Sequence, residues 1–552
     1  MRVKARTIVA FLAVAAALAP AAAHRPWGRP GPADPRRVRG ALHVHGPYSE
    51  DARGDVDEIA RQARQAGLDF VVITDHGRDD AAPGYHDGVL VLVGMEKSTD
   101  AGHALVLGAS PLGWRLDGEP ETVVADAEAQ DGFVVAAHPA SSRANSRWTA
   151  GCSGLAGLEV VNLAEPDAWP RVRHLLPVLA HYALDPRGAL LRALHPRREA
   201  LDLWDSCQAE RPLAGWLGSD AHGGFRVGPL FAPVPSYRAV FSLGSNHLLL
   251  DTPRNGDAAH DTALVWRALR AGRGYVALDA LADASRFRFE AVGATARAGL
   301  GETLILEDGA SARLEAGADA PPGTTLVLMR DGRPIARGPR IVQAVGTGVY
   351  RIEAYLDPRY VPGGRPLPWI LSNAIRVARS SEARPPGPPA PTPPHATTEV
   401  QDFEDGSLAP HWQIDRAADA SASVRTEAGV LRWDFGLGPG ARTYASLADY
   451  RPRDLSGTSG VAFRVRARER VRIDLQVRAR AGEETRIWRR SVLAGPEWSQ
   501  AYVPFAALRT YDPRGGRPDL ARVVGVYFYV ETAHLPPGRG GTVWIDDLGL
   551  VP

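Results

Sequence analysis

Histidines and carboxylates recur in the first half of the chain where short apolar runs end or begin. They are His43, His45, Asp75, His76, Glu96, His103, His138, Asp220 and His222. Imidazole and carboxylate are the ligands that Zn²⁺, Mn²⁺ and Fe²⁺ take in proteins, and no paired cysteines accompany them here. An isolated histidine at a strand end is usually a hydrogen-bonded structural residue. Six of the 16 histidines fall at these points, however, and this concentration predicts a metal site.

The spacing of two pairs supports this interpretation. His43 and His45 are separated by one residue, and so are Asp220 and His222. In an extended strand, residues i and i+2 point to the same face of the sheet. Each pair is therefore expected to reach the same cation.

The elements that must position these side chains are short, nearly continuous apolar runs alternating with helical patterns. A helix is predicted over residues 55–67, where Gly67 fits its end. Apolar runs of this kind are typical of strands buried on both faces, and their alternation with helices favours an α/β barrel or a doubly wound sheet. A barrel gathers the C-terminal ends of its strands at one face. The runs cover residues 40–45, 70–74, 89–93, 104–108, 133–137, 158–161 and 213–217.

Residues 39–284, within a domain predicted over residues 36–285, resemble the PHP superfamily, which includes histidinol phosphatases and the PHP domains of bacterial DNA polymerases. The resemblance implies a distorted (β/α)7 TIM-like barrel that holds two or three divalent ions, commonly zinc, manganese or iron. The matching motifs occur in the family order. They are Leu42-His43-Val44-His45, Ser49-Glu50, Thr74-Asp75-His76, Gly94-Met95-Glu96, Gly102-His103, Ala137-His138-Pro139 and Gly218-Ser219-Asp220-Ala221-His222.

The resemblance also implies roles for single residues. Around one metal or metal pair it places His43, His45, Glu96 and Asp220, with Glu96 as a bridge between ions. The remaining sites would be completed by His76, His103, His138 and His222, and Asp75 would orient a ligand. Many relatives have an aspartate after the serine, whereas this chain has Ser49-Glu50-Asp51. Either carboxylate could fill that place, and the register favours Glu50.

The expected reaction is hydrolysis by a metal-activated water, with Glu96, Asp220 and His222 as catalytic residues. Divalent ions supply hydroxide at neutral pH and neutralise charge on a phosphoryl group. The expected substrate is a small phosphorylated molecule, a nucleotide or a sugar phosphate. Arginine suits phosphate through its forked donors, and the candidates near the motifs are Arg78, Arg143 and Arg147. Two alternatives are an amide or ester hydrolase with the same metals, and a non-catalytic protein that binds a glycan or other ligand at the cell surface.

The charge balance and the N-terminal sequence indicate what the protein binds and where it is located. The 552 residues include 64 Lys and Arg against 63 Asp and Glu, so no basic footprint for duplex nucleic acid is expected. Residues 1–23 combine basic residues, a short apolar core and small residues, which is typical of a secretory signal peptide; an uncleaved anchor is the alternative. No later apolar run is long enough to span a bilayer. The mature protein is expected to be secreted or periplasmic.

Beyond the metal-binding region, the pattern becomes that of β domains. A small β-sandwich is predicted for residues 286–378, a proline-rich linker for 379–398, and a jelly-roll β-sandwich for 399–552. The last segment resembles galactose-binding-like and carbohydrate-binding modules. A structural Ca²⁺ site is a candidate there, as is glycan stacking on exposed rings. The residues concerned are Glu404, Asp405, Asp546 and Asp547 for calcium, and Trp412, Trp433, Trp488 and Trp498 for stacking.

The two cysteines, Cys152 and Cys207, leave two alternatives open. In an oxidising compartment they would form one disulfide, and otherwise they would be two small buried side chains.

Overall fold

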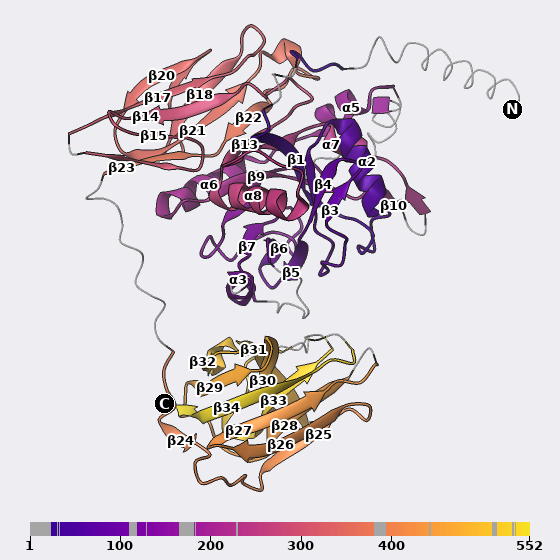
Figure 1. The fold of residues 1–552 in the computed structure, drawn as a ribbon, viewed down its shortest axis with the longest axis vertical. Coiled ribbons are helices and arrows are strands. Elements are labelled where there is room, and N and C mark those ends of the chain that lie inside the picture. Colours follow the sequence, from indigo (N-terminus) through magenta and orange to yellow (C-terminus); the bar gives the residue numbers. More distant parts are fainter. Residues whose placement is uncertain are drawn as a thin grey trace, which may run out of the picture. The chain divides into compact units, whose positions relative to one another are not determined.

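The fold is known from a computed structural model, in which two compact units are distinct (Figure 1). One unit takes in the described residues up to 379, and the other takes in those from 393 onwards. The described residues are 24–379 and 393–552, except for 30, 32–33, 110–118, 129, 165–180, 183, 228–229, 308, 441–442, 511–515, 533–534 and 536. The signal peptide predicted for residues 1–23, and most of the predicted linker, lie outside this range. Within it, no helix is long and apolar enough to cross a membrane.

The first unit begins with strands and helices that together frame the candidate site. The helices are α2 (Val56–Ala66), α3 (Pro120–Glu128), α5 (Pro186–Ala193), α6 (Arg198–Glu210), α7 (Tyr237–Phe241) and α8 (Ala258–Ala271). The strands are β1 (Arg37–Val44), β2 (Phe70–Ile73), β3 (Gly84–His86), β4 (Val89–Val93), β5 (Met95–Thr99), β6 (Gly102–Leu107), β7 (Phe133–Ala136), β8 (Gly157–Asn162), β9 (Ala214–Ala221), β10 (Phe225–Val227), β11 (Leu230–Ala232), β12 (Ser245–Leu249) and β13 (Gly274–Ala277).

The main sheet of this unit is mixed rather than parallel. β1 pairs in parallel with β2 and β9, and the parallel arrangement continues from β2 to β4 and from β9 through β8 to β7. β5, β6 and β7 pair antiparallel, as do β1, β12 and β13. A bridge between His76 and Glu96 brings the segment after β2 against β5, and the sheet is closed.

The predicted (β/α)7 TIM-like barrel is therefore wrong. Strand is the dominant structure, and six α-helices are found among the described residues. Hairpins replace the expected helical crossovers, because β3 pairs antiparallel with β4 and β5 pairs antiparallel with β6. A (β/α)7 barrel requires a helix after each parallel strand, and in the described part of the chain no helix directly follows β2, β4 or β7.

The helix predicted over residues 55–67 is confirmed as α2, and its ends show why it forms there. The side chain of Asp55 accepts a hydrogen bond from the Glu58 backbone and caps the N-terminus. Gly67 adopts φ +78° at the C-terminus, a left-handed conformation that glycine takes without steric cost. Between them, Ile59, Ala60 and Ala63 are buried against the sheet.

Residues 288–379 form ten strands in two layers, and one layer is continuous with the main sheet. Four strands make a separate antiparallel sheet in the order β15–β14–β17–β20. In the other layer, β22 pairs with β21 on one edge and with β13 on the other. The strands are β14 (Arg288–Val292), β15 (Arg297–Ala298), β16 (Thr303–Leu306), β17 (Ala312–Gly317), β18 (Thr325–Arg330), β19 (Arg333–Gly338), β20 (Ile341–Val345), β21 (Gly348–Tyr355), β22 (Pro368–Ser372) and β23 (Ile375–Arg379).

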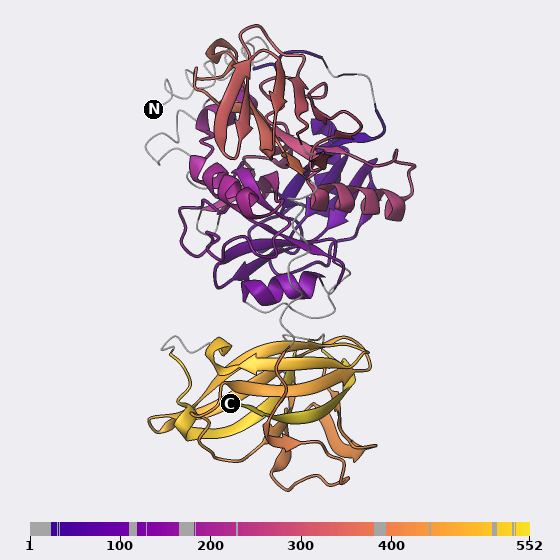
Figure 2. The same ribbon diagram turned by 90° about the vertical axis from the view of Figure 1, so that its left-hand side faces the viewer.

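The second unit confirms the expectation of a C-terminal β-sandwich. One sheet has the order β26–β27–β34–β29–β32 with β24 beside β34, and the other has the order β25–β28–β33–β30–β31; Figure 2 shows the two layers. Side chains such as Leu431, Trp433, Leu475 and Phe528 fill the core between them. The strands are β24 (Thr398–Gln401), β25 (Trp412–Arg416), β26 (Ser421–Glu427), β27 (Val430–Gly436), β28 (Tyr444–Asp449), β29 (Gly460–Ala467), β30 (Val471–Ala481), β31 (Glu484–Ala494), β32 (Ser499–Pro504), β33 (Val523–Glu531) and β34 (Gly540–Val551).

Cys152 and Cys207 form a disulfide in the first unit, with their Cα atoms 5.8 Å apart. The bond links the loop before β8 to α6, which packs against β8.

Candidate metal centre

The chain gathers nine metal-type side chains into one place, which we call the histidine–carboxylate cluster. Most stand at or just beyond the ends of strands in the main sheet, where neighbouring strands converge. Subsets of three or four of them bring one ligand atom each within 4.8 Å of one another. The members are His43, His45, Asp51, His76, Glu96, His103, His138, Asp220 and His222.

Glu96, on β5, is the hub of the cluster, and its two oxygens face different histidines. Oε1 lies 2.8 Å from His103 Nδ1 and 3.1 Å from His138 Nε2. Oε2 lies 3.0 Å from His76 Nδ1 and 3.3 Å from the Nε2 atoms of both His43 and His45. A carboxylate placed in this way can serve two cations at once, one through each oxygen.

Asp220, near the end of β9, completes a second group of close ligand atoms. Its Oδ1 lies 3.5 Å from His43 Nε2 and 3.3 Å from His45 Nε2, and these two nitrogens are 3.1 Å apart. With metal–ligand bonds of about 2.0–2.2 Å, two ligands of a tetrahedral ion stand about 3.3–3.6 Å apart. The separations in this group match the edges of such a polyhedron, so the donor set fits a divalent transition metal.

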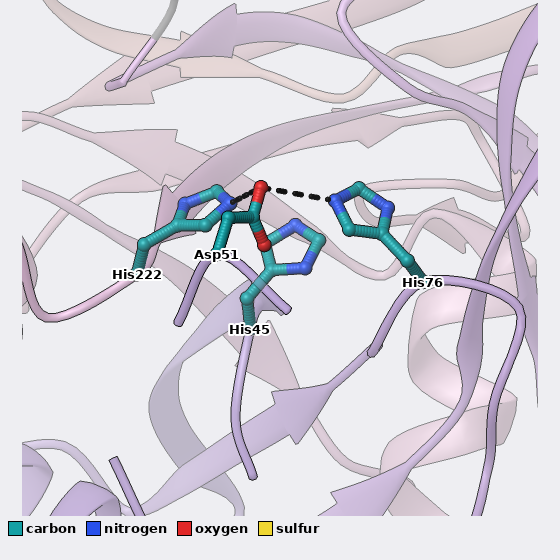
Figure 3. Close-up of side chains that lie close together, drawn as sticks. All are labelled: His45, Asp51, His76 and His222. Carbon is teal, nitrogen blue, oxygen red and sulfur yellow. Dashed lines mark ion pairs between the residues drawn. The ribbon is translucent and has the colours of Figure 1, made fainter. Parts of the chain in front are cut away.

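The third group contains the carboxylate that follows Ser49, and it is Asp51 rather than the predicted Glu50. Asp51 Oδ2 lies 3.3 Å from His222 Nε2 and 3.5 Å from His76 Nε2, with His45 beside them (Figure 3). Glu50 is exposed and lies outside the cluster. The reason is local: residues 47–50 form a turn, so the pleat of β1 does not extend to position 50.

Two further carboxylates hold histidines of the cluster in place. Glu159, buried in β8, accepts from His43 Nδ1 at 2.7 Å, and its second oxygen accepts from the His138 backbone at 2.7 Å. Asp75 accepts from the Ser49 hydroxyl at 2.7 Å, and Ser49 in turn contacts His45 Nδ1 at 3.0 Å. Such partners fix the tautomer and the orientation of a metal-binding imidazole. Asp75 could be expected from the sequence motifs, whereas Glu159 could not, because it is a single carboxylate inside an apolar run.

The backbone at three cluster residues departs from regular strand geometry. His43, His138 and Asp220 have φ values of 62°, 26° and 48°, in the left-handed region that non-glycine residues seldom adopt. At His43 the register of β1 shifts against both β2 and β9. His43 and His45 therefore meet through a bulge and not through the regular i, i+2 alternation that their spacing suggests.

Charge in the cluster is balanced between acids and imidazoles. Burial disfavours the charged form of His43, but its carboxylate neighbours, Glu159 foremost, raise its pKa well above the ordinary value. Burial likewise opposes the ionisation of Glu96 and Asp220, yet the histidines around them hold the pKa of both carboxyls well below their usual range. In the absence of a metal, protonated imidazoles thus take the place of cations.

This balance predicts that metal binding releases protons. Burial lowers the pKa of His76, but hydrogen bonds to Asp51 and Glu96 outweigh burial and raise it to about 10. A metal ligand must be a neutral imidazole, so binding at pH 7 has to displace that proton, and affinity should increase up to about pH 10. Titration calorimetry in buffers of different ionisation enthalpy measures the release. His76→Gln should release fewer protons, and unchanged protonation at pH 7 would contradict the prediction.

The same shift sets the pH dependence of the metal-free fold. Because the folded pKa of His76 is raised above its unfolded value of about 6.5, its stabilising contribution is complete below pH 6.5. That contribution is lost as the pH increases towards 10. The melting temperature of the chelated protein, measured between about pH 6.5 and pH 10, should fall accordingly.

The three candidate phosphate-binding arginines lie on loops of the first unit. Arg78 pairs with Asp80 at 2.7 Å, and Arg147 donates to the Ser141 carbonyl at 2.6 Å. Arg143 is exposed on the loop that follows His138. No contact of these three guanidinium groups with the cluster is present among the described residues.

The second unit places its candidate residues differently from the sequence-based expectation. Trp412, Trp433 and Trp488 are core residues, at 6%, 0% and 2% exposure, and they are not available for stacking on a sugar. Trp498 is half-buried, with Arg464 and Arg466 over its ring at 5.0 and 5.2 Å.

The calcium candidates also lack a site. Arg464 pairs with Asp546 at 3.2 Å and reaches Asp547 at 3.7 Å, so a guanidinium already balances these carboxylates. In the described part of the chain, none of the groups of potential metal ligands contains Glu404, Asp405, Asp546 or Asp547.

Comparison with known proteins gives similarity only at the level of solved structures. No family model and no curated protein matches the chain. The family 11 carbohydrate-binding module of the cellulosomal cellulase Lic26A-Cel5E of Clostridium thermocellum is similar at 17% identity and a TM-score of 0.24, over 29% of this chain and 96% of the module. The same type of module in complex with a β-1,3-1,4-mixed-linked tetrasaccharide gives 16% and 0.23, over 27% and 92%. An exo-β-agarase gives 16% and 0.22, over 28% of this chain and 25% of the agarase.

Proposed function

We propose that the first unit is a metal-dependent hydrolase that cleaves phosphoesters of small molecules, as its motifs of the PHP type imply. One observation carries this proposal: the two oxygens of Glu96 face separate sets of histidines, an arrangement suited to holding neighbouring cations. When bound, such ions lower the pKa of water and neutralise charge on a phosphoryl group. Nucleotides and sugar phosphates are the proposed substrates.

Two groups of residues would each hold one cation. His43, His45 and Asp220 converge within 3.1–3.5 Å and would anchor one cation, with Glu159 fixing the ring of His43. Asp51, His76 and His222 would form a second position; these three are partly exposed, so substrate can reach them. The carboxylates Glu96 and Asp220 would remain ionised, because the surrounding histidines hold their pKa values low.

The experiment is a joint measurement of metal content and hydrolysis on the purified full chain. The substrates are nucleotides, sugar phosphates, p-nitrophenyl phosphate, and an amide and a carboxylic ester as alternatives. We expect at least two transition-metal ions per chain and phosphate release. Both should be lost in His43→Ala and Asp220→Ala, but kept in the control His260→Ala, whose side chain pairs with Asp261 on α8. Bound metal with turnover of only the amide or ester would replace the phosphoesterase proposal, and absence of metal would overturn it.

A second candidate function is glycan binding by the C-terminal sandwich. It is favoured by the outer face of the sheet that contains β28, β30 and β33. There the part-exposed rings of Tyr444 and Tyr529 stack at 5.4 Å. The neighbouring Tyr527 ring is buried under Arg478, at 3.7 Å, and only supports this face. Asp474 and Gln476 on the same face are polar but buried. Aromatic rings beside fixed polar groups suit a sugar, which has an apolar face and a hydroxyl rim.

Tyr529→Ala is expected to weaken polysaccharide binding by up to about tenfold, since an aromatic contact contributes about 0.5–1.5 kcal/mol and about 1.4 kcal/mol corresponds to a factor of ten in affinity. Affinity electrophoresis of the full chain in gels containing neutral or acidic polysaccharides measures the effect. Tyr502→Ala changes a tyrosine of the opposite sheet, on β32, and is the matched control. If no polysaccharide retards the wild type, this candidate is excluded; equal retardation of wild type and both variants would move the binding site elsewhere.

A further inference from the structure

Tyr237, the first residue of α7, is a buried side chain that contacts three segments of the metal centre. It is 1% exposed, and α7 packs against both α2 and β9. The sequence motifs do not include it, because it lies beyond the last of them, which ends at His222. Its role has to be inferred from its contacts in the fold.

The hydroxyl of Tyr237 links the backbones of two of these segments. It donates to the His45 carbonyl at 2.7 Å and accepts from the Gly54 N–H at 3.3 Å. His45 belongs to the cluster, and Gly54 follows Asp51 of the cluster by three residues. Burial raises the pKa of the phenol, so the hydroxyl keeps the proton that it donates. The hydroxyl therefore ties the segment after β1 to the segment that carries Asp51.

The ring of Tyr237 touches the third segment. A Cβ atom on Gly223 would lie 2.4 Å from the ring carbon Cε2, and a Cβ atom on Gly54 would lie 2.4 Å from the same carbon. Side chains do not approach a ring so closely, so both backbones lie directly against its edge. Gly223 also has φ +69°, in the left-handed region that favours glycine. Because Gly223 directly follows His222, the ring supports the backbone from which His222 extends.

These contacts converge on the more exposed part of the cluster. Asp51 Oδ2 and His222 Nε2 are 3.3 Å apart, and both residues stand on segments that contact Tyr237. The ring of His222 also stacks on that of His45 at 4.1 Å. The group around Glu96, by contrast, comes from β5, β6 and the segment after β7. No hydrogen bond joins Tyr237 to these elements among the described residues.

The other proposed cation position has its own support. Glu159 holds the ring of His43, and Asn162 donates to Asp220 at 3.4 Å. Its remaining histidine, just after β1, also keeps a backbone hydrogen bond of 2.9 Å to β9. None of these three contacts involves Tyr237. A change at Tyr237 should therefore act mainly on the exposed position.

We propose that Tyr237 is a positioning residue for the exposed cation position, the one formed by Asp51, His76 and His222. It sets the spacing between the segments that carry Asp51 and His222, so that both side chains can reach one ion. This inference rests on the proposed metal centre, and it assigns Tyr237 no contact with a substrate.

The test is equilibrium dialysis of the chelated full chain against buffered Zn²⁺, which counts bound ions as the free concentration increases. Tyr237→Phe removes the hydroxyl and keeps the ring, whereas Gly54→Ala keeps the hydroxyl and pushes a methyl group against the ring. Asp51→Asn identifies the binding step that belongs to the exposed position. Tyr275→Phe is the matched control, because Tyr275 is also 1% exposed and its hydroxyl donates to the Ala284 carbonyl at 2.7 Å.

We expect Tyr237→Phe and Gly54→Ala to weaken the step identified by Asp51→Asn by about tenfold or more, the usual effect of losing an indirect partner of a metal ligand. The other step should stay unchanged, and Tyr275→Phe should leave both steps unchanged. Saturating Zn²⁺ should restore hydrolysis by Tyr237→Phe to the wild-type rate, which a general loss of structure would not allow.

Wild-type binding of both ions by Tyr237→Phe and Gly54→Ala would overturn the proposal, as would an equal weakening of both steps or a matching shift in Tyr275→Phe. If the wild type binds two ions but hydrolyses no phosphoester, the proposed reaction fails, and the dialysis alone decides the role of Tyr237. Fewer than two ions on the wild type would overturn both proposals. Circular dichroism establishes that each variant is folded, and if one of the first two is not, the other decides.

Discussion

Glu96→Gln is expected to reduce the metal content to less than one ion per chain and to abolish hydrolysis. The substitution preserves the volume of the side chain but turns one of its two acceptor oxygens into an NH₂ group, which then meets histidine nitrogens at about 3 Å. Even an indirect partner of a metal ligand costs about 10–100-fold in affinity when it is removed. Losing the hub should therefore weaken metal binding by more than about 100-fold. Metal analysis after gel filtration, together with phosphate release, measures both effects.

The matched control for this prediction is Glu50→Gln. It makes the same chemical change at an exposed glutamate one residue from Asp51. Metal content and turnover should remain at the wild-type level, whereas Asp51→Asn should lower the occupancy of the site that it shares with His76 and His222. Retention of metal by Glu96→Gln, or its loss in Glu50→Gln, would contradict the arrangement described above.

Trp369→Ala is expected to destabilise the whole first unit by about 3–5 kcal/mol, the usual cost of removing a buried tryptophan. Trp369 is fully buried on β22, and its indole N–H donates to the Ala282 carbonyl at 2.8 Å. Because β22 pairs with both β21 and β13, we expect residues 24–379 to lose their structure in one transition. Urea denaturation followed by metal release and by far-UV circular dichroism should give coincident midpoints, both shifted downwards.

Trp433→Ala provides the contrast in the C-terminal sandwich, where Trp433 is also fully buried. It should lower the midpoint of that unit and leave metal release unchanged. A Trp369→Ala protein in which metal release kept its wild-type midpoint, while other structure melted earlier, would mean that residues 288–379 fold on their own.

The residues that gather in the cluster could be predicted from the sequence because their side-chain types are those that bind metals. Eight of the predicted positions fall in the cluster, since histidines and acids at the ends of apolar runs have few other reasons to occur together. Glu50 was a wrong choice because the turn after β1 breaks the strand register there. Glu159 escaped notice because a single acid in an apolar run carries no pattern, although its burial in β8 makes it a partner of two histidines.

The arrangement of the strands could be predicted much less well. Nearly continuous apolar runs such as those of β4 and β6 are expected of parallel strands, yet β6 pairs antiparallel with β5 and β7. An apolar composition indicates that both faces of a strand are buried, but it does not indicate the direction of the strand. The pairing of β22 with β13 joins residues almost 100 positions apart, and no local periodicity encodes such a contact.

The left-handed backbone at His43, His138 and Asp220 has an evolutionary consequence. Each such residue costs about 1–3 kcal/mol, a cost that only surrounding structure can sustain. Glycine would relieve that strain, so a lineage selected for stability alone would accumulate glycine at these three positions and lose their imidazole and carboxylate groups. Divergent copies of this fold in which the cluster has no role should therefore be recognisable by glycine at the positions of two histidines and an aspartate. In copies that retain the ligands, selection must be acting on what the cluster does.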